Sequence, residues 1–357
     1  MATIRVLVVE DSITVRRRLV DVLESDAGLE VVAEAENGQR AIELCQALRP
    51  DVITLDMHLP VMDGVSATEH IMGHFPTPIL IVSSSTNRGD LFKTYDALAA
   101  GAVDVLEKPT GTEVDGTWER KFLAAVKMVS RIRVITHPRA RLGTVGRVHV
   151  PPLEVPLPSV SSVTQQGRSL IALGASTGGP GALVDVLREI PPALEATILI
   201  VLHIDEPFSS AFADWLGSQT AHAVVYARGG EPLASPGPRA FMAPPGRHLI
   251  ARAGRLGLSG DPERHFCRPS VDVLFESLAL ECPGRTIACL LTGMGRDGAA
   301  GLLALRRAGA CTIAQDEATS VIYGMPREAA LLGAAERIVA LPEIGAAITR
   351  LSTKASS

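Results

Sequence analysis

Acidic and basic residues in the first third of the chain follow apolar runs that are typical of strands. Glu10 and Asp11 come after the first run, Asp56 after the third, Ser83 after the fourth and Lys108 after the fifth. If these runs are parallel strands, their carboxyl ends meet at one sheet edge, where ligands of open α/β sheets bind. Three carboxylates there would repel one another unless a cation lay among them, and oxygen ligands suit Mg²⁺. We expect a carboxylate beside the ion to attack a phosphoryl donor, while the lysine and the hydroxyl stabilise the transferred oxygens.

A glycine-rich segment in the second half of the chain holds a serine in a setting that suits a nucleophile. Ser176 lies in the sequence GASTGGP (174–180), between a strand candidate and a helix candidate. Small neighbours permit the sharp strand-to-helix turn that exposes the serine in G-x-S-x-G sites, and the helix N-terminus can stabilise an oxyanion. A turn that binds phosphate, or merely turns, fits the pentapeptide equally well, although no lysine follows as a Walker A loop requires.

A serine nucleophile needs a base, and the base needs an acid that orients it. His203 directly follows the apolar run 198–202, so it is expected at the same sheet edge as Ser176, although a lone histidine after a strand is more often structural. The other histidines of this half are predicted to lie in loops or surface segments: His222, His248 and His265. Asp297 in the run LLTGMGRDG is the first candidate for the acid, and spacing leaves three competitors: Asp205, Asp272 and Asp316.

The elements that must position these residues form two alternating patterns. Apolar runs alternate with helix-compatible stretches at 4–9, 29–33, 51–55, 79–82 and 103–106. From residue 169 onward, strand candidates at 170–173, 197–202, 286–291 and 311–314 accompany helix candidates at 181–190 and 209–216. Such alternation predicts a parallel sheet covered by helices. We therefore predict two doubly wound α/β domains, at residues 1–125 and 168–350, joined by a helical and proline-rich linker at 126–167.

Composition limits the classes of function that fit. The formal net charge is −5 without a basic block and aromatic residues make up only 4%, so nucleic acid is not a predicted partner. The five cysteines are odd in number and lack CxxC spacing, which predicts free thiols in a reducing compartment. The N-terminus does not read as a signal peptide and no apolar run reaches ~18 residues, so we expect a cytoplasmic protein without membrane insertion.

The first constellation resembles the receiver domain of response regulators, a flavodoxin-like fold with five strands. An isolated aspartate after a strand is more often a helix cap, but four motifs occur in the family's order: VVEDS (8–12), LDMHLPVMDG (55–64), VSS (82–84) and EKP (107–109). The resemblance implies phosphorylation of Asp56 by a phosphohistidine donor, and therefore a sensor histidine kinase as partner. It also implies a Mg²⁺ site made by Glu10, Asp11, Asp56 and the carbonyl of His58, with Ser83 and Lys108 sensing the phosphoryl group.

One position departs from the common receiver pattern. Many receivers have an aromatic residue three positions before the lysine, where its rotamer reports phosphorylation, but Val105 stands there in this chain. We therefore expect the signal to pass through shifts of helices and of the domain interface.

The second constellation resembles the catalytic domain of CheB-type chemotaxis methylesterases. Four separated motifs carry the likeness over roughly residues 168–350: GASTGGP, RPSVDVLF (268–275), LTGMGRDGAAG (291–301) and QDEATSVIYGMPREA (315–329). The resemblance implies that Ser176 is the nucleophile, His203 the general base and acid, and Asp297 the residue that orients His203. It further implies oxyanion or positioning roles for Thr177 and Met294, and no cofactor in this domain.

The same resemblance implies a substrate and a control. The enzyme would hydrolyse glutamyl methyl esters on chemoreceptors, releasing methanol, and would deamidate receptor glutamines through the same acyl-enzyme. A kinase of the CheA type would supply the phosphoryl group. The unphosphorylated receiver would cover the serine edge, and phosphorylation would shift the population toward an open arrangement.

Two other classes of protein are compatible with the sequence, and one segment departs from the methylesterase pattern. A receiver attached to a hydrolase-like fold used only for docking would lack turnover, and a DNA-binding response regulator would need a basic helix-turn-helix output domain. The segment after the base reads His203-Ile204-Asp205-Glu206-Pro207, whereas family members often have His-Met-Pro there. The two additional carboxylates are expected to affect which substrate is accepted.

Overall fold

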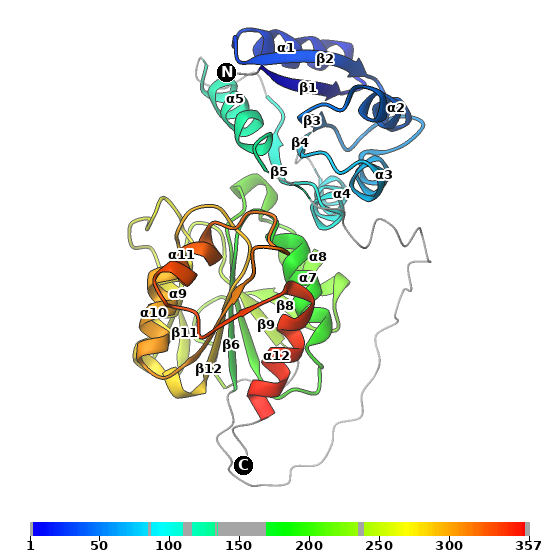
Figure 1. The fold of residues 1–357 in the computed structure, drawn as a ribbon. Coiled ribbons are helices and arrows are strands. Elements are labelled where there is room, and N and C mark those ends of the chain that lie inside the picture. Colours follow the sequence, from blue (N-terminus) through cyan, green and yellow to red (C-terminus); the bar gives the residue numbers. More distant parts are fainter. Residues whose placement is uncertain are drawn as a thin grey trace.

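The computed structural model describes residues 3–84, 87–109, 116–132, 134, 169–234 and 239–353. These residues form two α/β units, each built around a parallel sheet (Figure 1). Most of the proline-rich part of the expected linker lies outside the described residues. Among the helices that are described, none combines the length and the apolar character needed to cross a bilayer.

The sheet of the first unit has five parallel strands in the order β2-β1-β3-β4-β5. Its strands are β1 (Ile4–Val9), β2 (Leu29–Ala35), β3 (Val52–Leu55), β4 (Ile79–Ser83) and β5 (Asp104–Glu107). Its helices are α1 (Ile13–Glu24), α2 (Gly38–Leu48), α3 (Gly64–His74), α4 (Arg88–Ala99) and α5 (Thr117–Val129). Helices α1 and α5 pack on one face and α2, α3 and α4 on the other, and the middle strands are accordingly mostly apolar.

Helices α1 to α4 begin where the sequence supplies a capping side chain. Ser12, Asn37, Asp63 and Asn87 each accept a hydrogen bond from the backbone N–H three residues later. Such caps satisfy an amide that has no partner within the helix. They therefore fix the ends of the β–α loops that carry the acidic residues.

The sheet of the second unit has seven parallel strands in the order β14-β13-β12-β6-β7-β9-β8. Its strands are β6 (Leu170–Ala175), β7 (Thr197–Leu202), β8 (Ala223–Tyr226), β9 (Arg239–Met242), β12 (Thr286–Leu290), β13 (Cys311–Gln315) and β14 (Arg337–Val339). An antiparallel pair, β10 (His248–Arg252) and β11 (Arg255–Ser259), lies beside this sheet. The predicted α/β fold class, with a five-stranded first sheet and a parallel second sheet, is confirmed.

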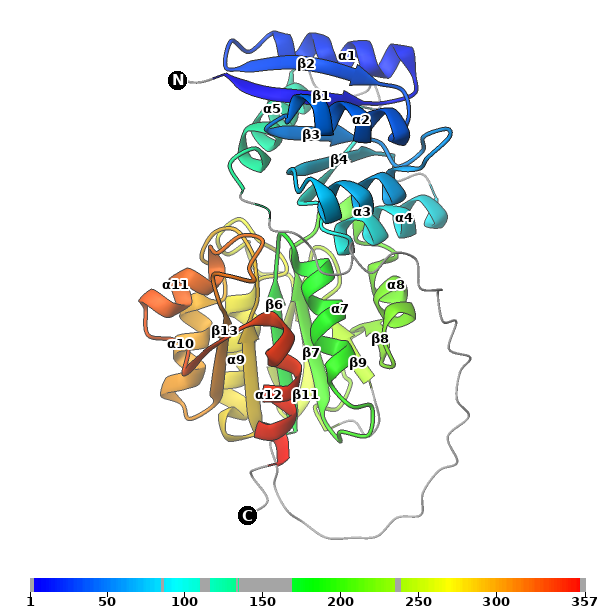
Figure 2. The same ribbon diagram turned by 45° about the vertical axis from the view of Figure 1, so that its right-hand side comes forward.

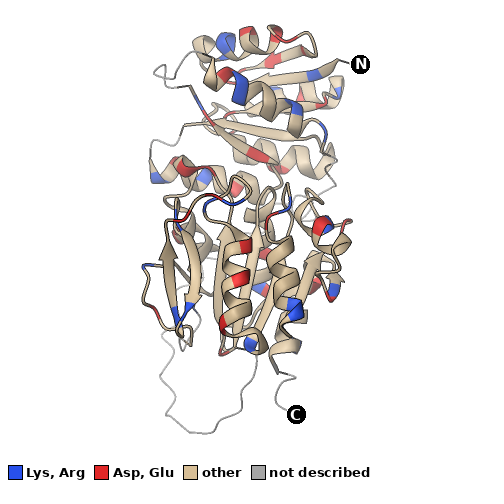
Figure 3. Ribbon diagram, turned by 90° about the vertical axis from the view of Figure 1, so that its left-hand side faces the viewer, with Lys and Arg blue, Asp and Glu red and all other residues tan. Residues whose placement is uncertain are grey.

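Helices cover both faces of the second sheet. Helices α7 (Gly179–Glu189), α8 (Phe212–Gln219) and α12 (Leu341–Thr353) pack on one face, and α9 (Val271–Glu281), α10 (Ala299–Arg307) and α11 (Met325–Leu331) on the other. Short 3₁₀ turns occur at Glu206–Phe208 and Pro283–Arg285. Figure 3 shows few charged residues on the strands of the second sheet, most of which are buried on both faces.

The expected helix at 209–216 is displaced in the structure. A 3₁₀ turn at Glu206–Phe208 comes first, and α8 begins only at Phe212. Pro207 lies in the first turn of this 3₁₀ segment, where its fixed φ and missing N–H are tolerated. The shift leaves the carbonyl groups of Phe208 and Ser209 free to accept bonds from tyrosine hydroxyls.

The two units meet through α4, which lies against α7 and α8 (Figures 1 and 2). The Tyr95 hydroxyl is fully buried and donates to the carbonyl oxygen of Phe208 at 2.6 Å. The indole N–H of Trp215 donates to Asp96 at 2.9 Å, and the ring of Tyr95 contacts that of Trp215 at 5.4 Å between centroids. Buried apolar residues of both units form one continuous cluster across this contact.

Candidate catalytic and phosphoacceptor sites

Ser176 and His203 lie at one edge of the second sheet because their strands are neighbours. In the pairing of β6 with β7, Ala175 lies opposite Leu202, so the next residue of each strand leaves the sheet at the same point. The backbone N–H of His203 donates to the carbonyl oxygen of Ala175 at 3.0 Å. The predicted juxtaposition of these two residues is therefore present.

The turn that carries Ser176 is closely packed. The Ser176 N–H donates to the carbonyl oxygen of Thr292 at 3.0 Å, and Gly178 adopts a φ of 77°, a conformation that favours glycine. A Cβ atom on Gly293 would lie 2.7 Å from the Ser176 Cβ and 2.4 Å from the Met325 sulfur. Glycine at 293 thus permits the loop after β12 to support the serine turn directly.

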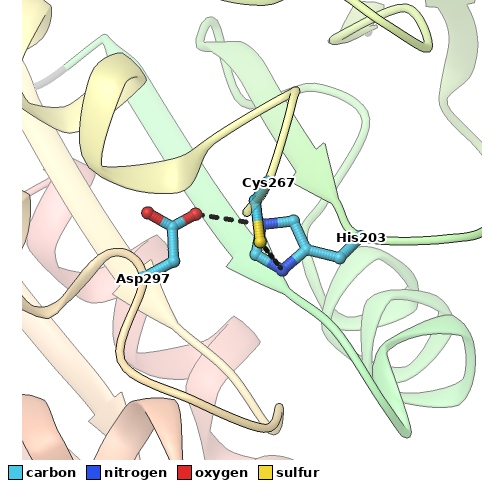
Figure 4. Close-up of side chains that lie close together, drawn as sticks. All are labelled: His203, Cys267 and Asp297. Atoms are coloured by element: carbon cyan, nitrogen blue, oxygen red, sulfur yellow. Dashed lines mark hydrogen bonds and ion pairs between the residues drawn. The ribbon is translucent and has the colours of Figure 1, made fainter. Parts of the chain in front are cut away.

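His203 is oriented by Asp297. The His203 Nε2 lies 2.9 Å from the Asp297 Oδ2 (Figure 4). The same carboxylate accepts hydrogen bonds from the Ser270 hydroxyl at 2.7 Å and from the backbone N–H groups of Val271 at 2.7 Å and Asp272 at 3.1 Å. Asp297 thus lies at the N-terminus of α9, where the helix dipole favours a negative charge.

These contacts shift the pKa values of Asp297 and His203 in opposite directions. Burial by itself would raise the pKa of Asp297, but the hydrogen bonds from His203, Ser270 and Val271 and the charge of His203 lower it. Burial by itself would lower the pKa of His203, but its contacts with Asp297 and Cys267 raise it to about 9. The contribution of the Cys267 charge exists only while that thiol is ionised.

The two nitrogens of the His203 ring have different partners. Asp297 accepts from Nε2, which therefore carries a hydrogen, so in the neutral form of the ring the lone pair is on Nδ1. The Cys267 sulfur lies 3.7 Å from Nδ1 (Figure 4). Nδ1 is consequently the atom that can accept a proton from an alcohol in this cleft.

The competing residues have other environments. Asp272 is fully buried, with its carboxylate 3.2 Å from His265 and in contact with the Gly301 N–H, while Asp316 accepts from Thr319. Asp205 is exposed. The expectation of a loop or surface position was wrong for His248, which is buried within strand β10, where its Nε2 lies 3.2 Å from the carbonyl oxygen of Pro262. His222 does lie in the loop before β8, although it is buried, with its Nε2 3.0 Å from the carbonyl oxygen of Ile190.

A cleft of about 690 Å³ joins the serine edge to the first unit. Its walls include Ser176, Thr177, His203 and Met294 from the second unit. The first unit contributes residues of β5 and α5, among them Asp104, Val105, Lys121, Ala125 and Met128. Val105, the position that lacks the aromatic residue, thus lies in the wall that faces the serine.

The acidic residues of the first unit converge as expected. Lys108 Nζ lies 2.8 Å from the Glu10 Oε2 and 2.9 Å from the Asp56 Oδ2. Burial by itself would lower the pKa of Lys108, but the charges and hydrogen bonds of the two carboxylates raise it. Burial, aided by the charge of Asp56, raises the pKa of Glu10.

The donor set fits a hard cation. Glu10, Asp11 and Asp56 offer carboxylate oxygens that all lie within 4.8 Å of one another. Within the described part of the chain, no group bonds to the Ser83 hydroxyl, although it is fully buried. The His58 side chain turns to Asp90, at 2.6 Å, which leaves the carbonyl of His58 as the predicted contact of that residue.

Two residues that contact the His203–Asp297 pair, Ser270 and Cys267, were not predicted from the sequence. Ser270 lies in a motif that was recognised, yet its bond to Asp297 was not anticipated; a serine directly before the apolar run of α9 is a typical helix N-cap and was a usable signal. Cys267 had no such signal, because its approach to His203 depends on the path of the loop between β11 and α9.

The fold and the sites define a class of two-unit proteins. In this class a receiver unit forms one wall of a cleft, and the second α/β unit places a serine at that cleft together with a histidine that an aspartate orients. Comparison with known families assigns residues 6–114 to the response regulator receiver domain and residues 171–348 to the CheB methylesterase family. A protein of Anaeromyxobacter dehalogenans named protein-glutamate methylesterase/protein-glutamine glutaminase 2 is 40% identical over 349 residues, which cover 98% of this chain and 97% of that protein. The chain therefore belongs to the CheB methylesterase family, and it carries a receiver domain.

A second relative matches over the same length. A protein-glutamate methylesterase/protein-glutamine glutaminase of Nitrosospira multiformis is 40% identical over 352 residues, covering 98% of this chain and 97% of that protein. The crystal structure of the Thermotoga maritima CheB methylesterase catalytic domain is 30% identical, covers 51% of this chain and 98% of that chain, and has a TM-score of 0.49.

Proposed function

We propose that this protein is a phosphorylation-activated protein-glutamate methylesterase that acts on chemoreceptors and also deamidates receptor glutamines. The observation that carries the proposal is the hydrogen bond of 2.9 Å between His203 and Asp297 at the sheet edge that also carries Ser176. The names of the full-length relatives support the same activity. Chemotactic adaptation is the process that this activity would serve.

In the proposed reaction, Ser176 attacks the ester carbonyl while His203 Nδ1 takes the hydroxyl proton. Asp297 stabilises the imidazolium that forms and keeps its Nε2 hydrogen in place. Backbone N–H groups at Thr177 and Met294 would stabilise the oxyanion. His203 then returns the proton to the leaving methoxide, methanol departs, and water activated by His203 hydrolyses the acyl-enzyme. A glutamine substrate loses ammonia at the same step.

The receiver would control access to this site. In the arrangement described here, β5 and α5 form one wall of the cleft, so a receptor helix could not lie across it. Phosphorylation of Asp56 by a sensor histidine kinase of the CheA type would change the contacts of Lys108 and of the Ser83 hydroxyl, which has no partner among the described residues. The resulting shift of α4 and β5 would weaken the closed arrangement in favour of an open one.

Glu10, Asp11, Asp56 and the His58 carbonyl would hold Mg²⁺ in the receiver. When bound, the ion offsets the negative charge of the phosphoryl group. Lys108 balances the carboxylates through its two ion pairs. The side chain of Asp56 is only 2% exposed, so access of the donor is confined to this edge of the sheet.

Methanol release from a methylated receptor tests the proposal. We expect release to require Ser176, to be lost in Ser176→Ala, and to increase with a small phosphodonor and Mg²⁺. Asp56→Ala should retain the basal rate without the increase. If neither the receptor nor a small ester is turned over in a serine-dependent manner, the protein is a docking protein and not an esterase.

A further inference from the structure

Cys267 reaches His203 through a tight turn. The backbones of Arg264 and Cys267 exchange two hydrogen bonds, of 3.1 and 2.9 Å, around His265 and Phe266. Both central residues have positive φ, 53° and 62°, which costs about 1–2 kcal/mol each for a residue other than glycine. Contacts of His265 with Asp272 and Arg296 hold the turn. The turn directs the Cys267 sulfur at the free nitrogen of the catalytic base.

We propose that His203 Nδ1 and the Cys267 thiolate together form a binding site for a thiophilic divalent cation, with Zn²⁺ as the reference ion, and that its binding inhibits the esterase. The distance of 3.7 Å between the two atoms supports this. A tetrahedral Zn²⁺ with Zn–N of ~2.05 Å and Zn–S of ~2.3 Å separates its N and S ligands by ~3.6 Å. The two side chains therefore need almost no movement to bind the ion.

The outer contacts of the histidine also match a zinc ligand. Histidines that bind zinc almost always donate their second ring N–H to a carboxylate or carbonyl, which fixes the tautomer. His203 does so to Asp297 at 2.9 Å. Asp297 also accepts hydrogen bonds from Ser270, Val271 and Asp272, so it stays in this supporting role and does not bind the ion itself.

The remaining ligand positions face water. His203 and Cys267 both line the cleft of about 690 Å³, so water molecules can complete the coordination. Thiolate is a soft ligand and selects Zn²⁺ over Mg²⁺. The site is thus chemically distinct from the oxygen-only site around Asp56.

Binding of Zn²⁺ releases protons from its ligands and removes the base from the reaction. The Cys267 thiol, and the protonated His203 ring at Nδ1, lose their protons to solvent as the S–Zn and N–Zn bonds form, and no electrons are transferred. The Nδ1 lone pair becomes a bond to the ion, so it can no longer accept the Ser176 proton. Inhibition rests on the proposed function, whereas metal binding does not.

Zinc chloride titrated into the full chain during hydrolysis of a small ester tests the inhibition. We expect wild type to lose activity and to recover it with a chelator, while equal Mg²⁺ has no effect. Cys267→Ser and Cys267→Ala should each raise the inhibitory concentration at least tenfold, measured against the variant's own zinc-free rate. Cys282→Ser, which changes a thiol outside the cleft, should match wild type.

Cobalt(II) provides a readout that needs no activity. We expect a thiolate-to-cobalt absorption band in wild type, retained in Ser176→Ala and lost in Cys267→Ser. Absence of that band in folded wild type would overturn the proposal even if the esterase proved inactive. Equal zinc sensitivity in wild type and in folded Cys267 variants would overturn it as well.

Discussion

The orientation of His203 depends on a carboxylate that is held by the start of a helix. Asp297 receives two backbone N–H groups and one hydroxyl from residues 270–272 in addition to the His203 ring. With all of these donors directed at it, the carboxylate has little freedom to rotate away from the base. A carboxylate constrained in this way is preorganised for the imidazolium that develops during proton transfer.

Replacing Asp297 with asparagine should lower kcat by roughly 10²–10⁴-fold, because the base loses its correct tautomer and its charge partner. The pKa of His203, raised to about 9 in wild type, should fall, because the negative charge no longer stabilises the imidazolium. The ascending limb of the pH–rate profile should therefore move to lower pH. Asp261→Asn, an exposed change away from the base, should leave the profile unmoved; an unmoved profile in Asp297→Asn would contradict the assigned role.

At the scale of elements, the sequence predicts those strands that are buried on both faces. β6, β7 and β12 are continuous apolar runs, and all three occur at the expected positions. β8 and β14 keep exposed residues and are only 4 and 3 residues long, so their patterns do not differ from those of loops. The positions of Ser176, His203 and Asp297 could be anticipated because each follows a strand or glycine-rich turn. The approach of Cys267 depends on a long-range loop contact that spacing does not encode.

The loop after β12 gives an element-scale prediction. Gly293→Ala would place a Cβ 2.7 Å from the Ser176 Cβ and 2.4 Å from the Met325 sulfur, so the serine turn must move. A displacement of ~1 Å at a catalytic group is sufficient for a loss of about 10²-fold in rate. Gly284→Ala is the matched control, since a Cβ there meets nothing within 4 Å. Ester turnover of folded Gly293→Ala at the wild-type rate would contradict the close support of Ser176.

At the scale of the whole molecule, the closed arrangement depends on buried contacts of α4. The Tyr95 hydroxyl and the Trp215 indole both make hydrogen bonds across the interface in apolar surroundings. The ion pair between Arg88 and Asp214 also crosses it, but these side chains are 66% and 57% exposed. Exposed ion pairs contribute little, so the tyrosine and tryptophan contacts should decide the equilibrium.

Tyr95→Phe should raise the activity of the unphosphorylated protein about fivefold, because a lost hydrogen bond of ~1 kcal/mol favours the open arrangement. Arg88→Ala should change the same rate less than twofold, because the ion pair between Arg88 and Asp214 is exposed to solvent. Methanol release from a methylated receptor without phosphodonor measures both. A larger effect of Arg88→Ala than of Tyr95→Phe would contradict this ranking.

Asp104 gives the closed arrangement a dependence on pH. Asp104 lines the cleft between the units, and burial, with a smaller contribution from the charge of Asp205 in the second unit, raises its pKa to about 6. A group whose pKa is raised on closure favours closure while protonated, so this contribution is fully present below pH ~4 and is lost as pH rises through about 6. Small-angle scattering should show more open molecules at pH 7 than at pH 5, and a smaller difference in Asp104→Asn. An equal difference in that variant would assign the effect to another group.

The rate at which a fluorophosphonate labels Ser176 in the full chain tests the central claim most directly. This rate reports both the reactivity of the serine and how far the receiver unit covers it. The account predicts one adduct, on Ser176, forming severalfold faster after addition of phosphodonor and Mg²⁺, with no acceleration in Asp56→Ala. An adduct on another residue, or the same rate with and without phosphodonor, would contradict it.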